Sequence, residues 1–106
     1  MNKEELFAAA KDEIFGVSPA CPMARVGRNM AISYFNPIIE DAEAVLLDMR
    51  VPHSGFATTL LNACKFYDAM TETPFPPETI QAVKRCQDNF CARYDTLLKE
   101  LSLKAA

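Results

Sequence analysis

The scarcity of glycine constrains the fold of this chain most. Only three glycines occur in 106 residues, at Gly16, Gly27 and Gly55. An all-β chain of this length needs many tight turns, and tight turns commonly use glycine because it adopts positive φ angles at no steric cost. Half of the residues are hydrophobic and 24% are charged, which is the usual balance of a globular chain. The sequence therefore predicts helices joined by a few breaks.

Prolines mark most of these breaks. Two lie in V-S-P-A-C-P over residues 17–22, and three lie in T-E-T-P-F-P-P over residues 71–77. Proline lacks an N–H and restricts the residue before it, so neither segment fits a helix interior. We also expect a helix to begin at Asn36-Pro37, because asparagine is a preferred N-cap and proline suits the first helical position. Pro52 should end that helix.

Between the breaks, apolar residues recur at helical spacing. The expected helices cover residues 2–15, 23–35, 36–51, 55–70 and 78–103. Residues 30–34 also alternate as a strand would, but no partner strand is evident elsewhere, so helix is favoured. The predicted fold class is all-α: a small antiparallel bundle of four to five helices, in a single domain over residues 1–106, with the C-terminal helix longest.

Some apolar residues lie outside the apolar stripe of their helix. Leu47 points away from the stripe of its helix, Leu61 widens that of the next, and Phe75 stands between two prolines in a connector. Single exposed apolar residues are normal in soluble proteins. Together, however, they indicate more apolar surface than one small bundle needs. Leu47, Leu61 and Phe75 are therefore our candidate interaction surface, and an irregular bundle that buries them is the alternative.

The helix expected over residues 23–35 also has apolar residues outside its apolar stripe. Its stripe consists of Met23, Val26, Met30 and Tyr34. Ile32 and Phe35 fall outside this stripe at about 100° per residue. We expect them to add to the apolar surface of the bundle.

The charge balance excludes some classes of partner. The net charge is −3 and the isoelectric point is about 5.1, whereas nucleic-acid binding modules carry a concentrated basic surface. The longest aliphatic run, residues 44–47, is far short of the ~20 residues that cross a bilayer. The first residues, M-N-K-E-E, lack the order of a signal peptide. We expect a cytoplasmic protein with reduced thiols, no nucleic acid and no membrane among its partners.

The four cysteines show no C-x-x-C pair, which structural zinc sites and redox motifs usually contain. Cys86 and Cys91 are about 140° apart around their helix and so do not share a ligand face. Together with Cys64 they fall within or beside apolar stripes, where free cysteine behaves as a small buried hydrophobe. We interpret these three as core residues. A thiolate site for Cu(I) or Zn(II) between facing helices is the alternative.

Cys21 differs from the other three. It directly precedes Pro22, where a helix should begin, and Arg25 and Arg28 follow within two turns. A thiol in such a position can have a lowered pKa, so Cys21 is the candidate reactive thiol. The alternative is a loop cysteine packed against the bundle.

Other catalytic patterns are absent from the sequence. The single histidine, His53, excludes bis-histidine haem ligation and the paired histidines of di-iron bundles. Glu40, Asp41 and Glu43 are explained by the first turn of the helix expected after Asn36-Pro37, where the dipole favours carboxylates. No glycine-rich phosphate loop occurs.

These observations predict a small, non-catalytic protein-interaction module without cofactor, such as an adaptor, chaperone, inhibitor or regulatory subunit. We expect it to bury an apolar face of residues 55–70, with part of 78–103, against a protein partner or in a homodimer. A thiol-based redox sensor or a Cu(I)/Zn(II)-binding helical protein is the alternative.

Overall fold

Five helices make up the structure, a computed structural model that describes the backbone of residues 2–105 and the side chains of residues 2–103. They are α1 (Lys3–Phe15), α2 (Pro22–Leu46), α3 (Phe56–Ala63), α4 (Phe66–Met70) and α5 (Pro77–Ala105). No strand occurs in this part of the chain. The predicted all-α bundle with its longest helix at the C-terminus is confirmed.

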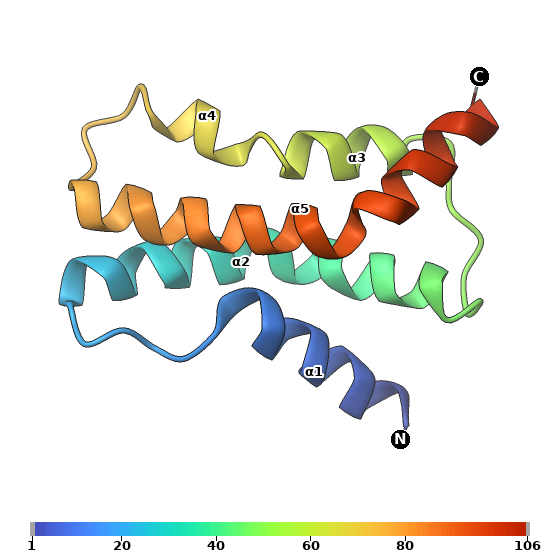
Figure 1. The fold of residues 1–106 in the computed structure, drawn as a ribbon, viewed down its shortest axis with the longest axis horizontal. Helices are drawn as coiled ribbons and strands as arrows, with labels where there is room; N and C mark the ends of the chain where they lie inside the picture. Colours follow the sequence, from blue (N-terminus) through green and yellow to red (C-terminus); the bar gives the residue numbers. More distant parts are fainter. Residues whose placement is uncertain (1, 106) are drawn as a thin grey trace.

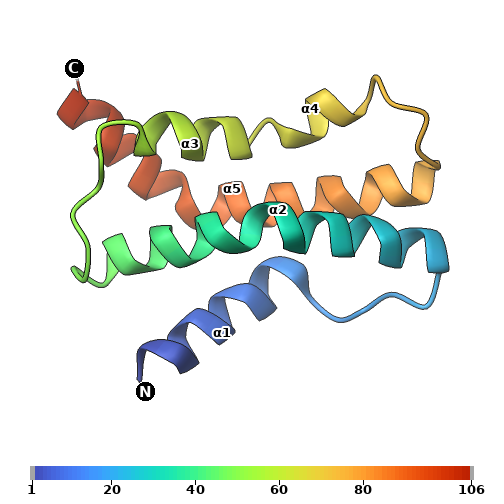
Figure 2. The same ribbon diagram turned by 180° about the vertical axis from the view of Figure 1, so that it is seen from behind.

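The helices α2 and α5 form the centre of the molecule and run in the same direction (Figure 1). The helix α1 lies along one edge of this pair, and α3 and α4 lie along the opposite edge, as both views show (Figures 1 and 2). The helices on the two edges, α1, α3 and α4, run antiparallel to α2 and α5. The molecule is flat, with extents of 39 × 34 × 17 Å. Since α3 and α4 pack mainly on α5, they cover little of α2.

The expected boundaries of α1 are confirmed by its caps. The Asn2 side chain accepts a hydrogen bond from the Glu5 backbone N–H at 2.8 Å. Gly16 ends the helix with φ 64°, a left-handed value that glycine adopts readily. The Arg28 guanidinium donates to the carbonyl oxygens of Phe15 and Gly16 at 3.2 and 2.8 Å. This arginine therefore fixes the end of α1 against α2.

The predicted break at Asn36-Pro37 is wrong. The helix α2 continues from Pro22 to Leu46 with Pro37 inside it. A proline in a helix interior removes one backbone hydrogen bond, but Pro37 lies on the exposed side of α2. Phe35 and Ile39 on either side are completely buried. Their packing holds the helix through the proline, and tertiary burial outweighs the local preference.

The single helix predicted over residues 55–70 is divided. The helix α3 ends at Ala63 with Cys64 as its C-cap, and α4 begins at Phe66. The Tyr67 backbone N–H, in the first turn of α4, donates to the side-chain oxygen of Gln87 on α5. Such an N–H has no partner within its own helix, so α5 supplies one. The division thus results from a contact that lies 20 residues away in the sequence.

The buried face of α2 also differs from the prediction. Ala31, Phe35 and Ile39 are completely buried, whereas Phe35 was expected outside the stripe. Ile32 is partly buried and packs against the core. Of the predicted stripe, Met23 and Val26 remain 43% and 45% exposed. The face that contains Gly27 packs inward, and at Gly27 α2 and α5 approach closely.

Gly27 and Thr79 mark this close approach. Thr79 is 1% exposed, and its hydroxyl donates to the Met23 carbonyl oxygen at 2.7 Å. A Cβ atom on Gly27 would overlap the Thr79 carbonyl oxygen and lie 2.9 Å from its carbon. These are backbone atoms, which cannot swing away as a flexible side chain can. Only glycine fits here.

We expect Gly27→Ala to lower the free energy of unfolding by about 2–3 kcal/mol, because the added methyl group forces α2 and α5 apart. Urea denaturation followed by circular dichroism measures this change. Gly55→Ala is the matched control, since its Cβ would meet no atom closer than 3.6 Å. Equal stability of the two variants would contradict the close contact.

Candidate functional site

An open apolar surface lies along the outer side of α2, next to α4. We call it the α2 surface, formed by Met23, Val26, Asn29, Met30, Ser33, Tyr34 and Phe66. All of these except Met23 line one shallow hollow of about 620 Å³. None of the seven side chains carries a charge. Methionine and aromatic side chains are enriched at protein interfaces, and methionine adapts its shape to a partner.

The aromatic wall of this surface is continuous with the core. The rings of Tyr34 and Phe66 are stacked, with centroids 3.9 Å apart and planes 6° from parallel. Phe35 meets both rings edge-on at 5.1 and 5.8 Å. Phe35 in turn packs against Phe90 of α5 at 5.0 Å. Both rings pack against the core, and their stack forms one wall of the hollow.

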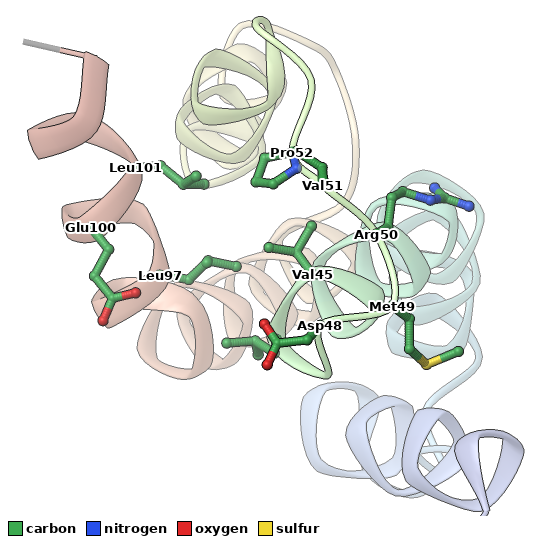
Figure 3. Close-up of a pocket in the computed structure, with 10 residues that line it drawn as sticks. Val45, Asp48, Met49, Arg50, Val51, Pro52, Leu97, Glu100 and Leu101 are labelled. Atoms are coloured by element: carbon green, nitrogen blue, oxygen red, sulfur yellow. The ribbon is translucent and has the colours of Figure 1, made fainter.

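A second hollow lies between the α2–α3 connector and the end of α5 (Figure 3). Its volume is about 380 Å³, and its lining mixes apolar residues with Asp48, Arg50 and Glu100. Arg50 is turned away from Leu97 and Leu101 and pairs with Asp41. This hollow therefore combines a small apolar floor with an acidic rim, unlike the uncharged α2 surface.

The three residues predicted as an interaction surface are partly exposed but lie on separate segments. Leu47 is 37% exposed at the end of α2, Leu61 is 42% exposed on α3, and Phe75 is 37% exposed before α5. The α2–α3 connector and the α4–α5 connector lie at opposite ends of the bundle (Figure 1). Leu47 and Phe75 therefore do not share one contact face.

Cys64 and Cys91 form a disulfide, with Cα atoms 5.5 Å apart, a usual separation for such bonds. Our interpretation of these two cysteines as unpaired core residues is therefore wrong. Both are half-buried. They lie 27 residues apart on different helices, so no local spacing in the sequence reveals the pair. Only the packing of α3 against α5 brings them together.

The other two cysteines are free. Cys86 is 2% exposed, as expected for a core residue, and burial raises its pKa although Arg28 and Arg85 oppose the effect. Cys21 is exposed and precedes the first residue of α2, so the helix start predicted at Pro22 is confirmed. Its reactivity stays a prediction.

His53, the single histidine, has a local structural role. The His53 ring nitrogen Nδ1 accepts a hydrogen bond from the Gly55 N–H at 3.2 Å, which shapes the turn before α3. Among the described residues, no group of three or more histidine, cysteine, aspartate or glutamate side chains is placed to hold a metal ion.

The position of Glu43 differs from the prediction. Glu43 is 3% exposed, near the end of α2 rather than in a first turn. Its Oε1 accepts hydrogen bonds from Arg93 Nε and the Tyr94 hydroxyl, both at 2.7 Å. Arg93 also pairs with Glu13 of α1. Glu43 therefore joins α2 to α5, and Arg93 extends this network to α1 through Glu13.

These contacts satisfy the buried charge. The Glu43 carboxylate, as hydrogen-bond acceptor, raises the pKa of Arg93. Burial first, and then Glu43, raise the pKa of Tyr94. The signal for Glu43 was its spacing, four residues after the buried Ile39 and eight after Phe35, which places it on the inward face of α2.

Comparison with protein-family models, with curated proteins and with solved structures finds no match to this chain. Within the described residues, no helix has a stretch long and apolar enough to span a bilayer.

Because the pKa of Tyr94 is raised on folding, the folded chain holds this proton more tightly than the unfolded chain. The resulting stability is complete below about pH 10, the unfolded value for tyrosine, and is lost as the pH rises above it. Urea denaturation on both sides of this pH should show the loss. Tyr94→Phe should weaken the dependence and Tyr67→Phe should retain it; the same slope in both variants would contradict the assignment.

The disulfide closes a loop of 27 residues, so its loss should lower the free energy of unfolding by about 3 kcal/mol. We expect this decrease for Cys64→Ser, measured by urea denaturation without reductant. Cys21→Ser, which removes an exposed free thiol, should leave stability unchanged. Equal stabilities for the two variants would show that the bond does not constrain the chain.

Proposed function

We propose that this chain is a small, cytoplasmic, non-catalytic interaction module that binds through the α2 surface, and that a second copy of the chain is the occupant. The observation that carries the proposal is the uncovered apolar side of α2. Met23 and Val26 are 43% and 45% exposed there, and the hollow beside them is lined without charge. Two cysteines are free and two are paired, and in a reducing compartment such a pair is usually transient.

The lack of charge favours a second copy over an unrelated partner. In a symmetric dimer the same patch meets itself, so a charged residue near the axis approaches its own copy at an electrostatic cost. The α2 surface avoids this cost because Asn29 and Ser33 are its polar residues, and both donate and accept hydrogen bonds. From Met23 to Tyr34 the stripe extends about 16 Å along α2.

The hollow beside the α2–α3 connector is a weaker candidate for self-association. Asp48 and Glu100 belong to its lining, and among the described side chains neither forms an ion pair. Two copies meeting there would bring carboxylates together. The residues first expected to form the contact face, on 55–70, are largely engaged with α5, since Phe56, Leu60 and Ala63 are buried in the core.

The thiol-based alternative receives support from one observation, the Cys64–Cys91 pair. It supports a redox role for this pair rather than for Cys21. Such a role is compatible with an interaction module, because a bond near a binding surface can control that surface.

We expect the purified protein to dimerise, and Val26→Glu to weaken the dimer by at least about tenfold, because the new charge loses water at the interface. Sedimentation equilibrium measures the association. Leu61→Glu is the matched control, since Leu61 is 42% exposed against 45% for Val26. Circular dichroism verifies that both variants are folded.

This experiment distinguishes an interface on the α2 surface from an interface on α3. Loss of the dimer with Leu61→Glu alone would move the interface to α3 and contradict the α2 surface. A monomeric wild type would exclude the second copy as occupant. A photoreactive residue in place of Met30 then tests the surface itself in cells: a discrete adduct abolished by Val26→Glu supports another partner, and no adduct contradicts the interaction function.

A further inference from the structure

The disulfide lies next to the wall of the α2 surface. Cys64 is the C-cap of α3, and Phe66 begins α4 only two residues later. Phe66 forms the wall by stacking on Tyr34 at 3.9 Å. The bond at residue 64 is therefore one restraint on the wall, beside the packing of Phe66 against the core.

Two anchors on α5 hold this stretch of chain. Cys91 bonds to Cys64, and Gln87, one turn earlier on the same face of α5, accepts the hydrogen bond of the Tyr67 N–H. Between the anchored residues, Lys65 belongs to neither helix. Without the covalent anchor, the start of α4 is tied to α5 by one backbone hydrogen bond and by side-chain packing.

We infer that Cys64 and Cys91 form a reversible redox site that regulates the α2 surface, so that the oxidised pair holds Phe66 in its binding position and the reduced pair releases it. This inference rests on the proposed function of that surface. The co-reactant is a low-molecular-weight disulfide of the glutathione type, or its thiol for the reverse reaction.

Oxidation proceeds by two exchange steps. The thiolate of one cysteine attacks the small disulfide, forming a mixed disulfide and releasing one small thiolate. The second cysteine, as thiolate, then attacks the protein sulfur of the mixed disulfide, closes the Cys64–Cys91 bond and expels the second small thiolate. The two protons from the cysteines end on the two small thiols. The cysteine sulfurs are oxidised and the small disulfide is reduced.

The location of the pair suits exchange rather than permanent bonding. Both cysteines are half-buried, near the surface of the bundle, whereas Cys86 is only 2% exposed. In a reducing cytoplasm, disulfides are usually transient and serve as catalysts or sensors. Formation or loss of the Cys64–Cys91 bond would thus change how the α2 surface binds a second copy.

The test equilibrates the whole protein with glutathione buffers of increasing oxidised fraction. Mass spectrometry after thiol alkylation measures the bond, and sedimentation equilibrium measures the dimer. We expect the reduced protein to dimerise about tenfold more weakly, because an ordered aromatic wall lowers the entropy lost on binding. Amide hydrogen exchange over residues 64–70 should accelerate on reduction. The double variant Cys64→Ser/Cys91→Ser should behave as reduced protein in every buffer, and Cys21→Ser as wild type.

Each outcome decides one of the two proposals. An unchanged dimer and unchanged exchange over residues 64–70 overturn the redox inference, while Val26→Glu still tests the surface. A monomer whose exchange responds to glutathione supports redox control of α4 and removes only the second copy as occupant. A bond that never titrates, or a reduced chain that unfolds in circular dichroism, makes the disulfide structural and overturns the inference.

Discussion

The close contact between α2 and α5 is the constraint on which the rest of the structure depends. Gly27 lies against the backbone of Thr79, and the Thr79 hydroxyl bonds to the Met23 carbonyl oxygen on α2. Two helices that approach this closely form a thin central pair. The remaining helices pack on its edges, which produces the flat molecule of 39 × 34 × 17 Å.

This arrangement also explains the open surface. The buried face of α2 contains Gly27, Ala31, Phe35 and Ile39, whereas Met23 and Val26 remain 43% and 45% exposed. The helices α3 and α4 pack on α5 and reach α2 through few contacts, among them the stack of Phe66 on Tyr34. The apolar side of α2 that is left open is the side on which the proposed contact with another helix rests.

Polar contacts then fix the edges of the bundle. Glu43 joins Arg93 and Tyr94 inside the bundle, and a buried carboxylate without such partners would be costly. On the other edge, Cys64 and Cys91 tie α3 to α5. The first contact is permanent as long as the chain is folded, whereas the second depends on the redox state of the surroundings. The edge of the bundle that contains Phe66, the wall of the α2 surface, is thus also the edge that contains the disulfide.

The all-α class, the long last helix and local boundaries such as Gly16 can be predicted from the sequence, because caps and apolar spacing act over a few residues and glycine scarcity disfavours an all-β chain. Tertiary structure decided the continuity of α2 through Pro37, the hydrogen-bond partners of Glu43 and the pairing of Cys64 with Cys91. Each of these depends on a partner from another helix, and sequence spacing holds no information about which helices meet. The inward face of α2 also depends on another helix, because α5 packs closely against the side that contains Gly27.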